Sequence, residues 1–514
     1  MHKRANIVFL VLLFSAACFL RMAGLGERDL WHDEAFTYFC STEASVSNHT
    51  PYYDVYEPPL YRSFMKVWLK ATGWTSEAGL RFPSAIFSIL SLFLFYRLAL
   101  YLAGPGVALA GLVVLAFSPL HIWYAQEARA YSLYCLEALA AVFFFLKALR
   151  EGRLVFWMAT AAFSLLALYT NYFSAMLILS QFCVLLIVRE YRKKLIPWLC
   201  CMFIVLVGYA PQLTAFFNKV LLMRRGFWWL TPPEGAGTVA VTFKNFFAGY
   251  SAQYDHFSSV LVFIALLFFF GVLSLAKEKP DALKILLSLV VVPMALAVLL
   301  SKAGIQVYLD RQFIVYSPFF YLILARGWLA LPGGSISRIG GFVIYLILIG
   351  SALANYYAGT PTAADLEHNA RGYVKKPVRP IAEYLEKNYK DGDAIGFSNS
   401  SVSMSLKYYW RRPDVAPEVF YICPDVEKDY YFKQKSAYGK TRTVRQRKFF
   451  FNSDDPRQLA RIRASRLWLV NCPWGQEDIG PTAQKAVTAL SPAYVPSETA
   501  AFGYCSVILL ERRR

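Results

Sequence analysis

The sequence predicts a polytopic α-helical membrane protein whose C-terminal part is an extracytoplasmic α/β domain. Three observations predict this fold class: an apolar composition, a series of apolar segments, and an uneven distribution of Lys and Arg between loops. Of the 514 residues, 57% are hydrophobic and only 17% are charged, whereas soluble domains contain about 25% charged residues. Such a composition is typical of a chain that crosses a lipid bilayer several times.

About eleven apolar segments each approach the length that a membrane-spanning helix needs. They lie at residues 7–25, 82–103, 106–121, 131–149, 154–171, 173–189, 195–217, 259–276, 283–301, 313–331 and 339–357. The first segment follows basic residues, so a cleaved secretory signal is the alternative to a helix. We predict an uncleaved helix, because the apolar run is long and no clear cleavage site follows it.

Lysine and arginine concentrate in alternate short loops, where they include Lys147, Arg150, Arg153, Arg189, Arg192, Lys193, Lys194, Lys277, Lys279, Lys284 and Arg338. Because loops rich in these residues stay in the cytoplasm, the pattern predicts a cytoplasmic N-terminus. The extracytoplasmic face then receives the loops 26–80 and 218–258, the turn around 119–130 and the region 358–514. A net charge of +19 need not indicate nucleic acid, because positive residues also flank membrane spans on the cytoplasmic side. No basic helix with interleaved aromatic residues lies outside the spans, so nucleic acid is not an expected partner.

Two domains are predicted, a transmembrane domain over residues 1–357 and a soluble α/β domain over residues 358–514. In the second, VRPIAEYLEKNYKDGD predicts an amphipathic helix, and the stretches AIGFS, VFYI, SRLWLVN and CSVILLE predict short buried strands. Helices are also expected at 401–410 and 481–490, and a mobile loop at 425–465. At most one disulfide can form among Cys423, Cys472 and Cys505, and the sequence leaves the pairing open.

An acidic pair, Asp33-Glu34, follows the first apolar segment in the string ERDLWHDEAFTYF. Two carboxylates at a membrane surface suit a general base or a metal ligand, and the alternative is a solvated loop. In an extended loop, neighbouring side chains point in opposite directions. One carboxylate is therefore expected to face a cavity, and the other its wall or a metal ion.

Further polar residues lie in the other outward segments. In SPLHIWYAQEARAYSLY, Glu127, Arg129 and Tyr131 are expected at the start of a helix, with 127 and 131 on one face. Arg129 suits a phosphate ligand, and the alternative is a Glu-Arg cap of the turn. Arg311 is either a phosphate ligand or an interfacial anchor. We hypothesise that Arg129 and Arg311 converge on one outward cavity.

Two weaker candidates complete the set. Glu57, before Pro58-Pro59, is either a site residue or a charge at a helix start. His256, beside Asp255, is a weak candidate for a metal ligand, and the alternative is an ordinary loop.

Four stretches of the sequence resemble a known family over residues 1–357. They are WHDEAFTY, EPPLYRSFMKVWLKATGWTSEAGLRFPSAIFS, SPLHIWYAQEARAYSL and DRQFIVYSPFFYLILARGW, in this order. They are similar to bacterial membrane glycosyltransferases of the dolichyl-phosphate-mannose-protein mannosyltransferase type, which have the GT-C fold. The resemblance implies transfer of a sugar from a polyprenyl-phosphate carrier to a protein, lipid or glycan acceptor. It also implies a multi-pass protein of the bacterial inner membrane, among membrane lipids, with its active site on the periplasmic or exterior face.

The resemblance also implies roles for individual residues. Asp33 matches the catalytic acid of the first loop and Glu34 its neighbour, while Glu127 and Arg129 match the acid and arginine of the second loop. Arg311 matches a basic residue before a proline-containing helix, and the matching stretches add Tyr131, Glu57 and Arg81 as candidate substrate-binding residues. Many members carry His where this chain has Glu57, which puts a His-based metal site there in doubt. A divalent metal is a candidate cofactor, with Glu34 and His256 as candidate ligands, and the sequence leaves metal dependence open.

Two other classes of protein compete with this interpretation. A secondary transporter or a flippase of lipid-linked sugars is the first, but transporters carry ionisable residues near the bilayer midplane and usually show internal repeats. Here the acids cluster in outer loops and no repeat is visible. A membrane protein with a purely structural role is the second, and it would not need three outward clusters of acids and arginines.

Overall fold

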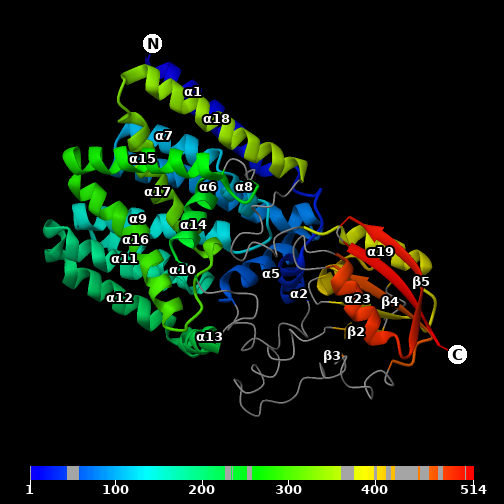
Figure 1. The fold of residues 1–514 in the computed structure, drawn as a ribbon. Coiled ribbons are helices and arrows are strands. Elements are labelled where there is room, and N and C mark those ends of the chain that lie inside the picture. The colour runs from blue at the N-terminus through cyan, green and yellow to red at the C-terminus, as the bar shows by residue number, and fades with distance from the viewer. Residues whose placement is uncertain are drawn as a thin grey trace. The chain divides into compact units, whose positions relative to one another are not determined.

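The computed structural model describes residues 2–42, 57–225, 233, 235–251, 257–359, 375–398, 402–412, 418–422, 450–451, 462–472, 479–503 and 505–513. The chain forms two compact units (Figure 1). The first comprises Met1–Leu25, Cys40–Gly226 and Leu230–His368, and the second comprises Gly26–Phe39, Phe227–Trp229 and Asn369–Arg514. The segment that follows the first helix therefore belongs to the same compact unit as the C-terminal region.

The first unit is helical throughout its described residues. Its helices are α1 (His2–Met22), α5 (Leu60–Thr72), α6 (Glu77–Leu102), α7 (Pro105–Ala116), α8 (Pro119–Ala125), α9 (Tyr131–Glu151), α10 (Leu154–Thr170), α11 (Ser174–Ile187), η1 (Arg189–Lys194), α12 (Leu195–Tyr209), η2 (Ala210–Gln212), α13 (Leu213–Arg225), α14 (Ala236–Ala248), α15 (Phe257–Glu278), α16 (Pro280–Lys302), η4 (Asp310–Tyr316), α17 (Ser317–Leu329) and α18 (Gly334–Ala358). Helix α2 (His32–Thr42) begins in the second unit. The predicted loop 218–258 contains the end of α13 and all of α14.

The length and composition of these helices confirm the prediction of a multi-pass membrane protein. Among the described residues, six helical segments are long and apolar enough to cross a membrane: α6, α9, α15, α16, α18 and the run Arg189–Arg224, which joins η1, α12, η2 and most of α13. The bent pair α7 and α8 would make a seventh. Shorter apolar helices cover Ile7–Met22, Leu154–Thr170 and Ser174–Ile187. Each segment predicted to span contains a helix, whereas the total of about eleven spans stays a prediction.

The break between α7 and α8 is a bend of 58°. Pro119 is the first residue of α8, where its missing N–H costs nothing, and the Ser118 hydroxyl accepts a hydrogen bond from the His121 N–H. The break leaves the last carbonyl groups of α7 outside the helical ladder. Arg21, which is fully buried, donates to two of them, the carbonyls of Ala116 at 2.9 Å and Leu115 at 3.1 Å.

The second unit contains a six-stranded sheet with the order β3-β2-β1-β4-β6-β5. The strands are β1 (Ala394–Phe397), β2 (Glu418–Ile422), β3 (Phe450–Phe451), β4 (Arg466–Asn471), β5 (Tyr494–Phe502) and β6 (Cys505–Arg512), and the helices are α19 (Val378–Asn388), α20 (Ser403–Tyr409) and α23 (Ile479–Leu490). Strands β1 to β4 pair in parallel, and β6 runs antiparallel to β4 and β5. The predicted α/β domain is confirmed. Most of the predicted loop 425–465 lies outside the described residues.

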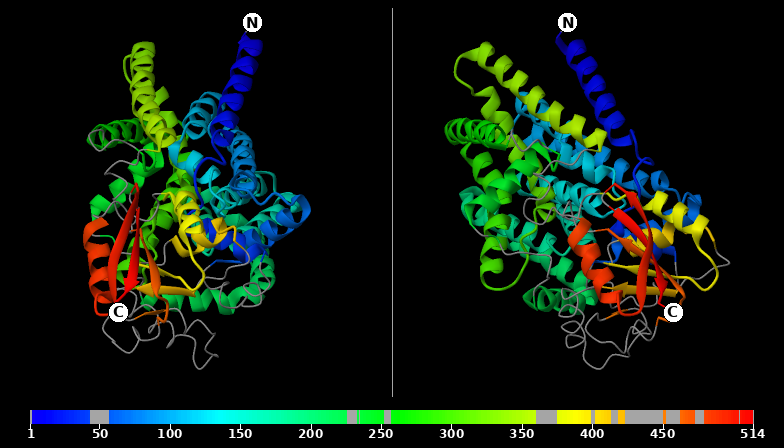
Figure 2. Two further views of the ribbon diagram at one scale, coloured as in Figure 1. Left: turned by 90° about the vertical axis from the view of Figure 1, so that its right-hand side faces the viewer. Right: turned by 45° about the vertical axis from the view of Figure 1, so that its right-hand side comes forward.

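Successive side chains of β4 pack into two separate hydrophobic clusters, one on each face of the sheet. Trp468 and Val470 pack with Ile381 and Leu385 of α19, whereas Leu467 packs with α23. Helices α19 and α23 therefore cover opposite faces of the sheet (Figure 2). This arrangement follows from the period of two along a strand, which sends successive side chains to opposite faces.

A disulfide joins Cys472, just after β4, to Cys505 at the start of β6. This pairing resolves the choice that the sequence left open, and Cys423 lies outside the described residues. The Lys376 ammonium donates to the carbonyl of Cys472 at 3.3 Å. Lys376 is only 9% exposed, and its burial lowers the pKa of the amine from 10.5 to about 7.

We expect Lys376→Met to stabilise the protein below pH 7. There, the lysine is protonated in both the folded and the unfolded chain, and the folded state carries a buried charge. Between pH 7 and 10.5, only the unfolded chain binds the proton, so the free energy of unfolding of the wild type rises with pH. The advantage of Lys376→Met in thermal unfolding should therefore be largest near pH 6 and shrink towards pH 10. An advantage that does not change with pH would contradict this assignment.

Candidate functional site

The acidic pair lies in the first turn of α2. The prediction of an extended loop with oppositely directed carboxylates is therefore wrong, because successive residues of a helix differ by about 100° around its axis. Acidic side chains at a helix N-terminus interact favourably with its dipole. The carbonyl of Trp31 accepts the first helical hydrogen bonds, and the Glu34 carboxylate accepts the Trp31 N–H at 3.5 Å. This reciprocal contact resembles a capping box and favours a helix here.

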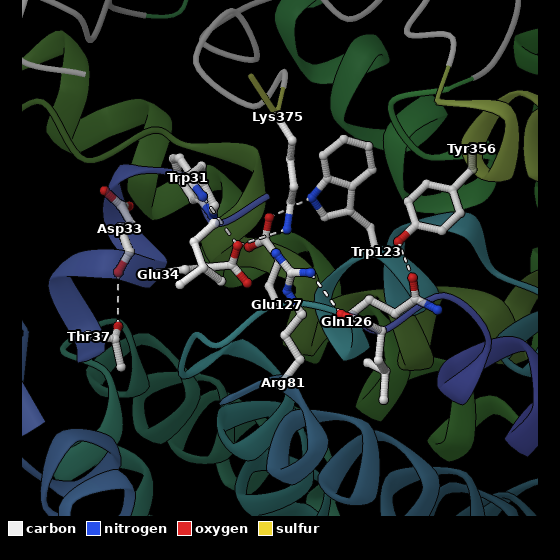
Figure 3. A network of polar contacts seen from close by, with 12 residues as sticks. Trp31, Asp33, Glu34, Thr37, Arg81, Trp123, Gln126, Glu127, Tyr356 and Lys375 are labelled. Carbon is white, nitrogen blue, oxygen red and sulfur yellow. Dashed lines mark hydrogen bonds and ion pairs between the residues drawn. The ribbon is translucent and has the colours of Figure 1, made fainter. Parts of the chain in front are cut away.

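The two carboxylates of the pair differ in exposure. Glu34 is fully buried, and its Oε2 forms an ion pair with the Lys375 Nζ at 3.0 Å (Figure 3). Asp33 is partly exposed, and its carbonyl accepts a hydrogen bond from the Thr37 hydroxyl at 3.0 Å. Asp33 is therefore the carboxylate of the pair that is better placed to meet a ligand.

The candidate metal ligands are not assembled in the part of the chain that the structure describes. Within those residues, no group of three or more His, Cys, Asp or Glu side chains could hold a metal ion. Glu34 is engaged by Lys375, and His256 lies outside the described residues. The described geometry thus provides no ligand set through which a metal-dependent step could be derived.

Glu127 and Arg129 lie in the turn between α8 and α9, which begins only at Tyr131. The prediction that they start a helix is wrong, and the reason is tertiary. The amide of Gln126 donates to the carbonyls of Leu20 at 2.9 Å and Ala23 at 2.7 Å, at the end of α1. The Tyr356 hydroxyl of α18 donates to the same amide at 2.8 Å (Figure 3). These bonds hold the turn in a non-helical conformation despite helix-forming residues.

Two side chains of this turn have defined partners. Glu127 is almost fully buried, and its Oε1 accepts the indole N–H of Trp123 at 2.8 Å (Figure 3). The guanidinium of Arg129, also buried, forms an ion pair with Glu57, which is about one-third exposed. Glu57 precedes α5 rather than starting it. The pair thus brings together the segment before α5 and the turn before α9.

The remaining candidates, Arg81, Tyr131 and Arg311, each have a different contact partner. Arg81 is buried on α6 and donates to the Leu25 carbonyl at 2.8 Å. Tyr131 is buried, with its ring centroid 4.6 Å from that of Tyr124. The Arg311 N–H donates to the neighbouring Asp310 carboxylate at 2.9 Å in η4.

Sequence reasoning missed three residues that hold these side chains in place: Lys375, Gln126 and Trp123. Trp123 lies four residues before Glu127, so helical spacing could have suggested that contact. Lys375 and Glu34 are 341 residues apart, and no local pattern connects them.

Comparison with known proteins agrees with the resemblance seen in the sequence. Residues 56–214 match the family model described as dolichyl-phosphate-mannose-protein mannosyltransferase. A search of curated protein sequences finds no match.

The fold of the whole chain is shared with solved membrane glycosyltransferases. ArnT from Cupriavidus metallidurans in the apo state superposes with a TM-score of 0.61 at 14% identity, over 98% of both chains. The same enzyme bound to undecaprenyl phosphate gives a TM-score of 0.58 at 14% identity, again over 98% of both chains. Archaeal oligosaccharyltransferase AglB from Archaeoglobus fulgidus, in complex with an inhibitory peptide and a dolichol-phosphate, gives 0.52 at 11% identity, over 99% of this chain and 74% of that chain. The chain therefore shares its fold with these solved enzymes, and its residues 56–214 are similar to the dolichyl-phosphate-mannose-protein mannosyltransferase family.

Proposed function

We propose that the protein is an integral-membrane glycosyltransferase that moves a sugar from a polyprenyl-phosphate carrier to an acceptor hydroxyl. The observation that carries the proposal is the position of Asp33, a partly exposed carboxylate in the first turn of a short helix soon after α1. The family match over residues 56–214 supports it. So do the undecaprenyl phosphate and dolichol-phosphate that the ArnT and AglB structures contain.

The reaction is an inverting displacement at the anomeric carbon. The Asp33 carboxylate takes the proton of the acceptor hydroxyl while the acceptor oxygen forms its bond to that carbon. The bond between the carbon and the phosphate oxygen breaks, and polyprenyl phosphate leaves with the electron pair. Glu127, in the second cluster, is the alternative base.

The leaving phosphate needs positive charge as its own negative charge develops. Arg129 and Arg311 are the proposed donors, because a planar guanidinium binds two phosphate oxygens at once. The ion pair with Glu57 orients Arg129 for this role. Arg81 donates to the Leu25 carbonyl and Tyr131 packs against Tyr124, and these contacts favour support of the site over direct contact with the phosphate.

The active face is placed outside the cytoplasm of a bacterial cell, in its inner membrane. The Lys and Arg bias of the short loops supports this orientation. Residues 1–357 would then form the transmembrane domain and 358–514 the extracytoplasmic domain, with residues 26–39 packed in the compact unit of the latter.

Release of the carrier tests the proposed reaction. The purified protein is reconstituted in liposomes with a series of polyprenyl-phosphate-linked sugars and candidate acceptors, and free polyprenyl phosphate is measured. A glycosyltransferase releases the carrier in proportion to the sugar transferred. A flippase moves the intact lipid-linked sugar across the bilayer and releases none, which would overturn the proposal.

We expect Arg129→Lys to lower kcat/KM for the donor by roughly 10–100-fold, the value of one or two charge-assisted hydrogen bonds. Lysine keeps the charge but loses the planar fork that meets both Glu57 and a phosphate. Arg150→Lys is the matched control, because Arg150 donates to the Tyr101 carbonyl in another part of the unit. Equal activities of the two variants would exclude Arg129 from phosphate recognition.

A further inference from the structure

Both side chains of the ion pair between Glu34 and Lys375 are buried. The Glu34 side chain is fully buried and that of Lys375 is 9% exposed, with 3.0 Å between Nζ and Oε2. An ion pair of this kind is weak evidence for stability, but removing one partner leaves a buried charge unpaired. The conformation of the first turn of α2 therefore depends on a lysine that lies just before α19.

Other contacts within the same unit hold the residues before this turn. The Asp29 carboxylate accepts the backbone N–H of Arg379 at 2.8 Å and lies 3.4 Å from its guanidinium. Because Arg379 is in the first turn of α19, Asp29 meets the positive end of that helix dipole. The Leu30 N–H donates to the Tyr409 hydroxyl at 2.8 Å.

Two ring contacts hold the residues after the turn. The rings of Tyr38 and Tyr408 meet edge to face with 5.1 Å between centroids, and the Lys407 ammonium lies 4.3 Å from the centroid of Phe39. The segment that carries Asp33 is thus fixed on both sides by α19 and α20, and Lys375 fixes the turn itself.

We infer that Lys375 is a positioning residue for Asp33, acting through its ion pair with Glu34. This inference rests on the proposed function, which makes Asp33 the base. Asp33 and Glu34 are consecutive in one helical turn, so a shift of the Glu34 backbone changes the direction of the Asp33 carboxylate. A base displaced by about 1 Å can lose about 10²-fold in rate. Glu34 is then an anchor of the turn rather than a second base or a metal ligand.

The neighbouring Lys376 cannot take the place of Lys375 in the ion pair with Glu34. Lys376 is directed to the Cys472 carbonyl and lies in the interior of the unit, so it does not replace Lys375. Lys387, which is exposed on α19, supplies a matched control with the same change of charge.

The test is a double-mutant cycle on Lys375→Met and Glu34→Gln, with Lys375→Arg as the conservative variant and Lys387→Met as the control. We expect Lys375→Met to lower kcat by about 10–100-fold with KM for the polyprenyl-phosphate donor within about twofold of the wild type. Lys375→Arg should restore most of kcat. The double variant should be less impaired than the product of the two single defects, because the residues act as a pair. Independent defects, or a wild-type kcat for Lys375→Met, would overturn the inference.

A second measurement does not depend on catalysis. In an Asp33→Cys protein, the rate at which a water-soluble thiol reagent labels residue 33 reports the orientation of the turn. Adding Lys375→Met should change this rate several-fold, and adding Lys387→Met should not. If the wild type transfers no sugar, the proposed function fails, whereas an unchanged labelling rate refutes the positioning role itself.

Discussion

Asp33→Asn is expected to lower the rate of sugar transfer by a factor of about 10²–10⁴, the usual contribution of a general base. Asparagine has nearly the same shape as aspartate, but it cannot accept the proton of the acceptor hydroxyl. The variant should keep its fold and bind the polyprenyl-phosphate donor normally, because the residue contributes only when the acceptor is deprotonated. The measurement is single-turnover transfer by the reconstituted protein, with donor binding determined separately.

Two further variants test whether the loss of sugar transfer is specific to the Asp33 carboxylate. Asp281→Asn removes a carboxylate that pairs with Lys284 on α16, and it should leave transfer unchanged. Glu34→Gln should show a smaller defect than Asp33→Asn, since Glu34 only orients the turn. If Asp33→Asn transfers sugar at the wild-type rate, the base lies elsewhere, and Glu127 becomes the leading candidate.

The second large effect is expected on stability. Arg21→Met removes a guanidinium that donates to the carbonyls of Leu115 and Ala116 and to the Ser88 hydroxyl. The carbonyls belong to the end of α7, at the break between two helices that together are long and apolar enough to cross a membrane. In a membrane, backbone groups freed at such a break need a partner. The Leu115 carbonyl keeps a backbone donor, the Ser118 N–H at 3.4 Å, so the losses fall on the Ala116 carbonyl and the Ser88 hydroxyl. A buried group left without a partner costs about 1–3 kcal/mol, so we expect a loss of roughly 3 kcal/mol.

Thermal unfolding of the detergent-solubilised protein measures this loss. Arg97→Met on α6 is the control, because Arg97 is exposed and its replacement should change stability little. Arg21→Lys should lie between the wild type and Arg21→Met, since an ammonium cannot reproduce the fork of the guanidinium. A stability of Arg21→Met equal to that of the wild type would show that the break in the span needs no donor.

Local patterns predicted most of the fold, and tertiary contacts explain where they failed. Strands β1 and β6 are recognisable in the sequence as short apolar runs. Strand β5 lies at the edge of the sheet and is mostly exposed, so its sequence contains no apolar run that would predict a strand. The turn at Glu127 contains good helix formers, but Gln126 binds carbonyls more than 100 residues away. For the acidic pair, the missed signal was local: acids in a first turn and a glutamate three residues after Trp31 are typical of a helix start.

The disulfide between Cys472 and Cys505 has a consequence for the cell biology of the protein. Disulfides between structural cysteines form and persist in oxidising compartments and are rare in the cytosol. Oxidation of these two cysteines therefore indicates that the domain folds in an oxidising compartment. The bond between Cys472 and Cys505 is independent of the Lys and Arg bias, because a charge distribution directs membrane insertion whereas a disulfide depends on an oxidising compartment. Membrane insertion and thiol oxidation are unrelated physical processes, and both support the extracytoplasmic location proposed for this domain.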